Sequence, residues 1–484
     1  MNLPQKLRYR RYEDWTAEEI AAIKAKMQQS PWHCHYHVEA SSGLLNDPNG
    51  FSYFNQQYHL FYQNWPFGAA HGLKQWVHLV SDDLVTFKET GIRVQPDHAN
   101  DHEGAYSGSA QVIDEHLFLF YTGNVRDEDW IRHPKQVGAW LDKEGQLTKL
   151  DSVLIEQPKS TTDHFRDPQI FSYNDHYYAI IGGQTLQKEG IIKLYRAVHN
   201  NVLKWEYVAD LDFGSDGSPY MIECPNLVFI DQKPVLIFCP QGLAKTTLAY
   251  DNIYPNTYII FEEFDPNTGR LSGSHGMQNL DFGFESYATQ AFNSPDGRVL
   301  AVAWAGLPDL ASPTDAYHYQ GALTLVRELT LKEGRLCQEP VAALAKLNTN
   351  ASSFADRKST SNSYHLALTI LANQVSQLCF FASPEKSGLL LTVDTTSGFL
   401  TLDRSQAGIQ YAQAYGSKRT CQIPQQHVTL NVYVDQSLIE IFVDQGQTVL
   451  TSRYYPESTK ANGLYLISGL ASGTFYEMRK QNGR

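Results

Sequence analysis

The chain has 484 residues, of which 42% are hydrophobic and 19% charged, a composition typical of a folded globular protein. A chain of this length is too long for a single ordinary hydrophobic core, so we expect two domains, or one large β architecture with a smaller one. The net charge of −13 argues against a nucleic-acid partner and against an anionic membrane surface.

The N-terminal residues and the cysteines indicate the compartment. The basic N-terminal stretch is followed by no apolar segment, and no run of 18 apolar residues occurs, so we predict neither a signal peptide nor a membrane span. The cysteines show no metal-ligand spacing and are expected to be reduced and mostly buried. The sequence therefore predicts a cytoplasmic protein. The six cysteines are Cys34, Cys224, Cys239, Cys337, Cys379 and Cys421.

The first clear element is a helix in an N-terminal extension, residues 1–30. Thr16 is followed three residues later by Glu19, which is a capping box, and Pro31 ends the helical pattern. Almost everything after this point reads as short strands separated by turn residues.

One type of apolar strand recurs in residues 31–346. The last bulky residues of its five copies are separated by 59, 60, 57 and 66 residues. A period of about 60 residues with several strands in each unit is typical of the four-stranded blades of a β-propeller. The fold class we predict is all-β, with a five-bladed β-propeller first. The five residues are Tyr62, Tyr121, Ile181, Phe238 and Trp304.

A polar motif precedes each of these strands. The motifs are NDPNG, YSGSA, RDPQ, ECPN and YATQ, and one polar residue in each lies 14 or 15 residues before the strand end. We expect these residues to occupy one structural position and to converge on the propeller axis. They are Asp47, Ser107, Asp167, Glu223 and Gln290.

Three of these five residues are carboxylates, and their shared position has three possible explanations. Asx-Pro turns start strands for backbone reasons alone. Gathered carboxylates also suit a hard cation such as calcium, or glycoside hydrolysis, which needs two acids with different tasks. Nearby side chains favour a sugar, because they offer aromatic faces and hydroxyl partners. These side chains are Trp65, Trp76, Tyr106, Trp304, Asn46, Gln63, Ser107 and Arg166.

The neighbours in sequence suggest different environments for the three acids. Arg166 precedes Asp167, and its positive charge is expected to help keep that acid ionised. Glu223 lies in the apolar string YMIECPNL, which would raise its pKa and suit a general acid. Asp47 lies in an amide-rich turn. The amides could donate hydrogen bonds to its carboxylate, as a carboxylate nucleophile requires.

These motifs, in this order, closely resemble glycoside hydrolase family 32. The strings LLNDPNG, FYQ, YSGSA, RDP and EC carry the resemblance, and SDDLVTF, YTGN, residues 281–287 and RELTL extend it. The resemblance implies a five-bladed propeller followed by a β-sandwich, and a retaining mechanism without metal or cofactor. It implies Asp47 as nucleophile, Glu223 as acid/base and Asp167 as the group that holds fructose hydroxyls. It adds Tyr287 to the expected substrate contacts, and leaves open whether Trp76 or Trp65 lines the sugar subsite.

A Ser/Asn/Thr-rich stretch at about residues 347–364 predicts a domain boundary, and alternating strands follow it. We expect a β-sandwich over residues 347–484. The string DQSLIEIF, Asp435 to Phe442, resembles the family's sandwich signature. Strand alternation predicts that its acids face solvent.

The compartment restricts the substrate. Sucrose imported by a phosphotransferase system arrives as sucrose 6-phosphate, so we predict hydrolysis of this ester. The alternatives are free sucrose or short fructo-oligosaccharides, fructosyl transfer, and a non-catalytic carbohydrate-binding propeller. A homodimer is also expected. A phosphate would meet some of Arg126, Arg132, His133 and Lys135, unless these form only an exposed charged loop.

Overall fold

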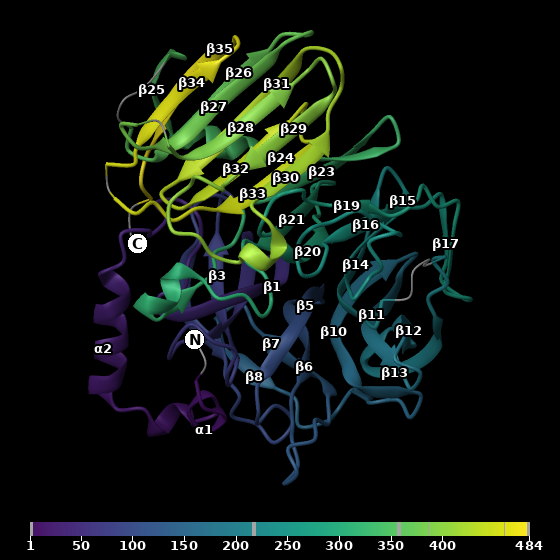
Figure 1. The fold of residues 1–484 in the computed structure, drawn as a ribbon. Coiled ribbons are helices and arrows are strands. Elements are labelled where there is room, and N and C mark those ends of the chain that lie inside the picture. Colours follow the sequence, from purple (N-terminus) through teal and green to yellow (C-terminus); the bar gives the residue numbers. More distant parts are fainter. Residues whose placement is uncertain (1–2, 215–218, 356–359, 386, 459, 482–484) are drawn as a thin grey trace.

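The computed structural model describes residues 3–214, 219–355, 360–385, 387–458 and 460–481, and these residues are mostly β-strand. Figure 1 shows two stacked C-terminal sheets above a larger group of sheets, with the N-terminal helices along one side. The predicted all-β class is confirmed. The helical elements are α1 (Gln5–Arg8), α2 (Ala17–Gln28) and the short turns η1 (Tyr12–Asp14), η2 (Pro313–Tyr317), η3 (Ala342–Leu347) and η4 (Gln413–Tyr415).

Helix α2 begins where the capping box predicted. Glu19 N–H donates to Thr16 Oγ1 at 3.2 Å, and Thr16 N–H donates to Glu19 Oε2 at 2.8 Å. The two bonds satisfy donors that the first helical turn leaves free. Among the described residues, no helix combines the length and apolarity needed to cross a membrane.

Five sheets are arranged around a common centre, and the strand nearest the centre comes first in each sheet. These strands contact one another in sequence, and the last contacts the first, so the ring closes. They are β1 (Gly43–Phe54), β5 (Ala105–Ile113), β10 (Thr161–Tyr173), β14 (Met221–Ile230) and β20 (Tyr287–Asn293).

The second strand of each sheet is the apolar segment on which the predicted period rested. It pairs antiparallel with the first strand and is almost wholly buried, since both of its faces are covered. The strands are β2 (Gln57–Trp65), β6 (His116–Gly123), β11 (His176–Thr185), β15 (Lys233–Gln241) and β21 (Val299–Trp304).

The remaining strands complete the five sheets. The short strand β22 (Tyr319–Gln320) pairs in parallel with β1, and so joins the end of the ring to its beginning. The others are β3 (Gln75–Ser81), β4 (Lys88–Val94), β7 (Lys135–Leu141), β8 (Leu147–Lys149), β9 (Ile155–Glu156), β12 (Gly190–Val198), β13 (Asn201–Asp210), β16 (Thr257–Ile260), β19 (Gln278–Asn279), β23 (Arg327–Lys332) and β24 (Arg335–Pro340), with β17 (Glu263–Asp265) and β18 (Arg270–Ser272) as a separate pair.

The prediction that the five motif residues share one structural position is wrong. Each first strand carries a β-bulge in its pairing with the second strand, and the motif residues take different places around it. Asp47 and Ser107 are equivalent, whereas Asp167 lies one place earlier and Glu223 two places earlier. Gln290 lies one place later, and its position in the fifth sheet is beyond the bulge.

The C-terminal strands form two sheets that share one hydrophobic core, which includes Leu366 and Ile441 of one sheet and Leu378 and Leu400 of the other. Residues 356–359 of the predicted linker lie outside the described residues. One sheet contains β25 (Asn348–Ser353), β35 (Ser472–Met478), β26 (Ser363–Ile370), β31 (Val428–Asp435), β32 (Leu438–Val443) and β33 (Thr448–Arg453). The other contains β30 (Lys418–Gln422), β29 (Phe399–Asp403), β28 (Leu389–Asp394), β27 (Val375–Ala382) and β34 (Gly463–Ser468).

The acids of the DQSLIEIF string do not face solvent, which corrects the sequence prediction. Asp435 and Glu440 are both 0% exposed, because the outer face of their sheet packs against the ring of five sheets. His37 lies between them, with Nδ1 2.9 Å from Asp435 Oδ2 and Nε2 2.9 Å from Glu440 Oε1. Burial alone would lower the pKa of His37, but its hydrogen bonds to the two carboxylates raise it, so the imidazolium is the stable form.

Arg327 extends this cluster to the end of the ring. Its Nη2 donates to Glu440 Oε2 at 2.7 Å and to Asp281 Oδ2 at 3.3 Å. Asp281 in turn accepts from Thr451 N–H at 2.9 Å and from Thr451 Oγ1 at 2.6 Å. Three strings that extend the family resemblance, DFG, RELTL and DQSLIEIF, therefore meet in one buried network between the ring and the C-terminal sheets.

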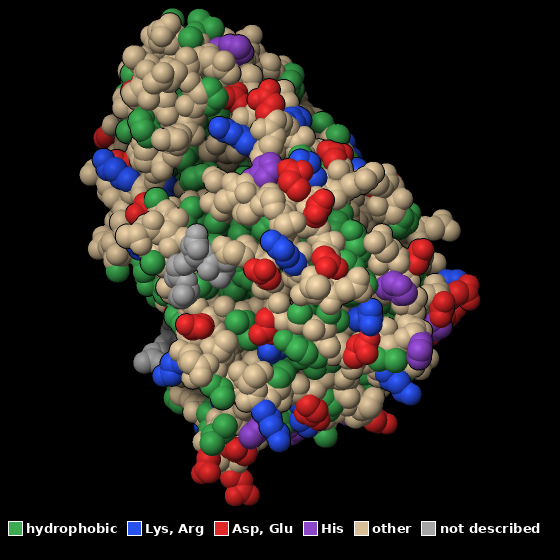
Figure 2. Space-filling model, turned by 90° about the vertical axis from the view of Figure 1, so that its right-hand side faces the viewer, with side chains coloured by type: hydrophobic (Ala, Val, Ile, Leu, Met, Phe, Trp, Pro, Cys, Tyr) green, Lys and Arg blue, Asp and Glu red, His purple; other side chains and the backbone are tan. Residues whose placement is uncertain are grey.

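Two further predictions concern cysteines and charge. All six cysteines are buried and free, as expected. On the face in Figure 2, acidic and basic side chains are interspersed, and no large patch of one sign covers it.

Candidate functional site

Asp47, Asp167 and Glu223 come together in a cavity of about 380 Å³ at one end of the ring. They belong to β1, β10 and β14, so three separate sheets each supply one acid. The bulges turn these side chains toward the centre. The predicted convergence of the acids is thus observed, although their strand positions differ.

Asp47 is held by a chain of hydrogen bonds. Ser107 Oγ donates to Asp47 Oδ2 at 2.5 Å, and Gln63 Nε2 donates to Ser107 Oγ at 2.6 Å. Asn46 Nδ2 donates to Gln63 Oε1 at 3.0 Å. Because each partner is fixed by the next, the Asp47 carboxylate has one orientation.

Lys74 supplies a buried positive charge beside this chain. Its Nζ donates to Asn46 Oδ1, and only 2% of the residue is exposed. Burial lowers the pKa of Lys74 to about 7, an effect that the charge of Asp47 opposes. Burial also raises the pKa of Asp47, which the hydrogen bond from Ser107 opposes and the charge of Glu223 reinforces.

Asp167 occupies a strained backbone position, with φ of 67° in the left-handed region. Its N–H donates to Thr122 Oγ1 at 3.0 Å, and its Oδ2 accepts from Cys224 N–H at 3.0 Å. Burial raises the pKa of Asp167 to about 7 against the opposing charge of Arg166. The charge of Arg166 acts to lower this pKa, as the sequence predicted, but desolvation has the larger effect.

The guanidinium of Arg166 is directed mainly at Glu223. Nη2 and Nε of Arg166 donate to Glu223 Oε1 at 2.6 and 3.1 Å. The other oxygen, Oε2, accepts from Gln241 Nε2 and from Tyr287 Oη, each at 2.7 Å. Glu223 therefore lies among polar donors, and the apolar setting inferred from its sequence neighbours is wrong, since alternate strand residues point elsewhere.

Most of the predicted substrate contacts also line the cavity. Ser107 lies behind Asp47, as its hydrogen bond requires. Trp304 is 1% exposed and has no hydrogen-bond partner for its indole Nε1. The lining residues among the predictions are Asn46, Gln63, Tyr106, Arg166, Tyr287 and Trp304.

Neither tryptophan considered for the sugar subsite reaches the cavity. Trp76 is 0% exposed, donates from Nε1 to Tyr106 O at 2.9 Å, and packs against Tyr121. Trp65 is also 0% exposed and packs against Phe67. The placement of Trp76 in the substrate site is thus corrected: strand β3 directs its ring into the core between two sheets.

Several lining residues were missed by the sequence analysis. Lys74 directly precedes the buried strand β3, and Gln241 ends β15. Their positions at strand ends are the one sequence feature that could have indicated a role in the site. Tyr9 comes from the N-terminal extension, far from any motif, and no sequence signal marked it. The others are His71, Gly72, His164, Tyr220, Tyr254, Pro308 and Asp309.

The four basic residues proposed for a phosphate do not act as one group. His133 Nε2 is 2.8 Å from Asp127 Oδ2, and Lys135 Nζ donates to Asn100 Oδ1 at 3.1 Å. Both lie at a separate surface hollow. Arg132 lines the carboxylate cavity. Arg126 pairs with Arg132 through an isolated antiparallel β-bridge within the same loop.

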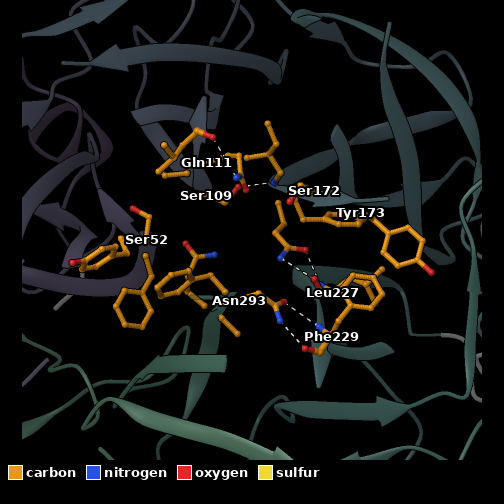
Figure 3. A pocket seen from close by; sticks show the side chains of 18 of the residues that line it. Ser52, Ser109, Gln111, Ser172, Tyr173, Leu227, Phe229 and Asn293 are labelled. Atoms are coloured by element: carbon orange, nitrogen blue, oxygen red, sulfur yellow. Dashed lines mark hydrogen bonds between the residues drawn. The ribbon is translucent and has the colours of Figure 1, made fainter. Parts of the chain in front are cut away.

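A larger cavity, of about 590 Å³, lies farther along the five first strands (Figure 3). Its lining includes Ser52, Ser109, Gln111 and Asn293, and no aspartate, glutamate, lysine, arginine or histidine of the described residues. Gln290, the fifth motif residue, lines this cavity instead of the carboxylate one. The lining offers no group that could exchange a proton near neutral pH.

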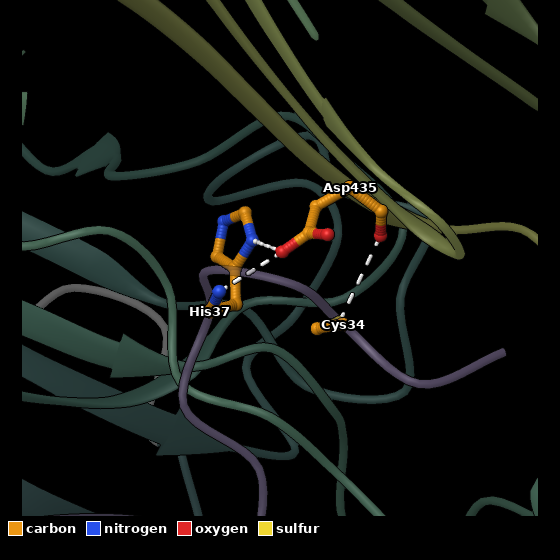
Figure 4. A group of neighbouring side chains, drawn as sticks. All are labelled: Cys34, His37 and Asp435. Atoms are coloured by element: carbon orange, nitrogen blue, oxygen red, sulfur yellow. Dashed lines mark hydrogen bonds and ion pairs between the residues drawn. The ribbon is translucent and has the colours of Figure 1, made fainter. Parts of the chain in front are cut away.

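Cys34, His37 and Asp435 are the one group of described residues close enough together to suggest a metal site (Figure 4). Both ring nitrogens of His37 already bind carboxylates, at 2.9 Å each, so neither lone pair is available. Burial also raises the pKa of the Cys34 thiol, which disfavours the thiolate that would bind a metal. These three side chains are therefore better explained as part of the buried interface network than as ligands of a cation.

Comparisons with known proteins identify related families and sequences. The family model described as the glycosyl hydrolases family 32 N-terminal domain matches residues 37–340, and the corresponding C-terminal model matches residues 334–479. The chain is 55% identical over 479 residues to the sucrose-6-phosphate hydrolase of Streptococcus mutans, which covers 99% of this chain and 100% of that one.

Two solved structures extend the comparison. The sucrose-6-phosphate hydrolase of Lactobacillus gasseri has a TM-score of 0.96 at 40% identity, covering 99% of this chain and 100% of that chain. A variant of a Bombyx mori family 32 β-fructofuranosidase, in complex with sucrose, has a TM-score of 0.83 at 26% identity, with coverage of 96% and 97%.

Proposed function

The chain belongs to glycosyl hydrolases family 32, and from this premise we propose that it hydrolyses sucrose 6-phosphate to glucose 6-phosphate and fructose. The observation that carries the proposal is the cavity in which Asp47, Asp167 and Glu223 meet, each fixed by different partners. Two acids with separate environments are what a retaining glycosidase requires. The likeness to proteins named sucrose-6-phosphate hydrolase over nearly the whole chain supports this substrate.

We propose that the five ring sheets are the blades of a five-bladed β-propeller and that the two C-terminal sheets form a β-sandwich. The closed ring of first strands and the shared core of the two later sheets support this architecture. The corresponding domains are an N-terminal helical extension over 1–30, a catalytic propeller over 31–346 and a sandwich over 347–484. The two family models meet within residues 334–340, close to the second boundary.

In the first step, Glu223 protonates the glycosidic oxygen and Asp47 attacks the anomeric carbon of the fructosyl unit. The carbon–oxygen bond to glucose 6-phosphate breaks, and an ester forms between fructose and Asp47. The hydrogen bond from Ser107 Oγ orients the Asp47 carboxylate for this attack. Burial raises the pKa of Asp47, and it raises that of Asp167 to about 7.

In the second step, Glu223 acts as a base and takes a proton from water, whose oxygen attacks the same carbon and frees Asp47. Arg166, Tyr287 and Gln241 hold the Glu223 carboxylate through both steps. Asp167, fixed by Cys224 N–H, holds fructose hydroxyls. The two steps retain the anomeric configuration and need no metal or cofactor.

The proposal predicts fructose release from sucrose 6-phosphate, with a higher kcat/KM than for sucrose, kestose or inulin. Fructose release is measured for each substrate, and proton NMR at early times identifies the anomer formed first. The β-anomer is expected first. Equal kcat/KM for sucrose 6-phosphate and sucrose would favour the unphosphorylated substrate, and no release from any fructoside would favour a carbohydrate-binding protein. Products longer than the substrate would indicate fructosyl transfer.

We predict that Lys74→Met shifts the acidic limb of the kcat/KM profile to higher pH by about 1 unit. The charge of Lys74 lowers the pKa of Asp47, so its removal raises that pKa, and ionised Asp47 then requires a higher pH. The measurement is kcat/KM against pH. Lys193→Met is the control, because Lys193 is equally buried but pairs with Asp210 outside the cavity. An unshifted limb in Lys74→Met would contradict the assignment.

We further propose that the protein works in the cytoplasm, where sucrose 6-phosphate is formed on import, and that it forms a homodimer. Exposed apolar side chains on the C-terminal sheets support association: Leu371, Val375, Ile467 and Leu470 are 40% to 65% exposed. Light scattering at micromolar concentration should give twice the chain mass, and a monomer would contradict the dimer.

A further inference from the structure

We infer that the phosphate group of the substrate binds at a patch formed by Arg8, Arg126 and Arg132 around Tyr9, which we name the arginine patch. The N-terminal extension would then be part of the substrate site. This inference rests on the proposed function and adds to it the groups that select a phosphorylated sugar. Tyr9 and Arg8 lie before residue 37, where the family model begins.

The N-terminal extension is attached to the cavity wall. Leu73 N–H donates to Arg8 O at 2.8 Å, and Arg8 Nη1 donates to His71 O at 2.9 Å. Tyr12 Oη donates to Leu73 O at 2.9 Å. The anchored loop contains Lys74, so these contacts tie the extension to the cavity wall whose lysine charge acts on Asp47.

Tyr9 lies near Arg8 and Arg126 and lines the same cavity as Arg132. It lines the carboxylate cavity, and its ring lies edge-on to Trp130 at 4.9 Å between centroids. The guanidinium of Arg126 lies 5.0 Å from the same indole ring. Burial raises the pKa of Tyr9, whereas the charges of Arg126 and Arg8 act to lower it, so both cations are within electrostatic reach of the tyrosine.

Carboxylates neutralise these arginines only weakly. Within the described part of the chain, neither the Arg8 nor the Arg126 guanidinium forms an ion pair, and that of Arg132 has only Asp163 Oδ2 at 3.9 Å. The Nε of each of the three is buried without a hydrogen-bond partner. In a chain of net charge −13, three guanidiniums with little carboxylate pairing, one lining the cavity and two acting on Tyr9 of its wall, favour an anionic ligand.

The charges around the cavity indicate on which side of it the phosphate of the bound substrate lies. The 6-phosphate is on the glucosyl unit, which lies beyond the bond that breaks, so it extends away from the three carboxylates. On the rim, Asp309 follows β21 and would repel a phosphate. Arg132 lies on the rim contributed by the second sheet, 5.9 Å from the Tyr106 ring. The phosphate is therefore expected on the side of Arg132 and Tyr9.

The test compares Arg8→Gln, Arg126→Gln and Arg132→Gln, singly and together, by kcat/KM for sucrose 6-phosphate and for sucrose. Each single change is expected to lower the ratio of the two values by about 10- to 100-fold, because sucrose has no phosphate whose contact could be lost. Arg335→Gln is the control, since Arg335 is exposed on β24, away from the cavity, and should leave the ratio unchanged.

Binding gives a second readout that does not depend on turnover. Glucose 6-phosphate should inhibit competitively, more strongly than glucose, and Arg132→Gln should remove this difference. Inorganic phosphate should compete in the same way. Because Arg8 also anchors the extension, its variant is checked by thermal melting, and Arg8→Lys should restore part of the preference for the phosphate.

The outcomes separate this inference from the proposed function. A wild type that prefers sucrose 6-phosphate, with variants that keep the same ratio, would overturn the arginine patch and leave the function intact. A wild type that releases no fructose from either substrate would overturn the function itself. A wild type with equal kcat/KM for both substrates would overturn the patch and the phosphorylated substrate together.

Discussion

Asp47→Asn is expected to lower kcat for fructose release on the order of 10⁵-fold, because the amide cannot form the ester with fructose. Asn keeps the volume of Asp47 and can accept the hydrogen bond from Ser107 through its carbonyl oxygen. The fold should therefore survive, and the loss should be one of chemistry. Initial rates on sucrose 6-phosphate and a thermal melt measure the two properties.

The matching variant of the other acid should behave differently. Glu223→Gln is expected to lower kcat about 10²- to 10⁴-fold, since it removes proton transfer but leaves the nucleophile. With a fructoside that carries an activated leaving group, this variant should accumulate the fructosyl ester, which mass spectrometry of peptides would locate on Asp47. Asp231→Asn, an exposed acid in the turn before β15, is the control and should keep full activity. An ester found on Asp167 would show that Asp167, and not Asp47, is the nucleophile.

Glu440→Ala is expected to destabilise the protein by about 3–5 kcal/mol, although Glu440 lies outside the carboxylate cavity. The substitution leaves the His37 imidazolium and the Arg327 guanidinium buried with fewer acceptors, and it removes the acceptor of Leu325 N–H at 2.7 Å. An unpaired buried charge costs more than the ion pair contributes.

Denaturant unfolding followed by intrinsic fluorescence gives the free energy of unfolding. Glu385→Ala, which removes an exposed glutamate from the same C-terminal region, should change it by no more than about 0.5 kcal/mol. Under native conditions kcat/KM should stay close to the wild-type value, because Glu440 contacts none of the three cavity acids. Equal stability of the two variants would show that the buried network is not needed to join the ring to the C-terminal sheets.

The local patterns determined much of the molecule. The capping box fixed the start of α2, since its bonds form between residues three positions apart. The period of about 60 residues predicted five successive sheets, because burial of both faces requires an apolar second strand each time. Asp47, Asp167 and Glu223 were recognisable as a set for the same reason: each precedes such a strand.

Other features depended on contacts between distant segments. Asp167, Glu223 and Gln290 lie at different places relative to the bulge, because the strand ends from which they were counted do not lie at equivalent positions opposite it. Strand alternation identified the outer face of a sheet but could not say that the ring would cover it, so Asp435 and Glu440 are buried.

The cavity's electrostatics were also decided by tertiary structure. Arg166 precedes Asp167 in sequence, yet its guanidinium binds Glu223 from another sheet. Lys74 and Tyr9 reach the cavity from segments without a motif. The sequence by itself determined which groups could perform the chemistry, because their types and spacing are local. Only the packed structure decided their charges and partners, because desolvation and ion pairing depend on which distant segments exclude water.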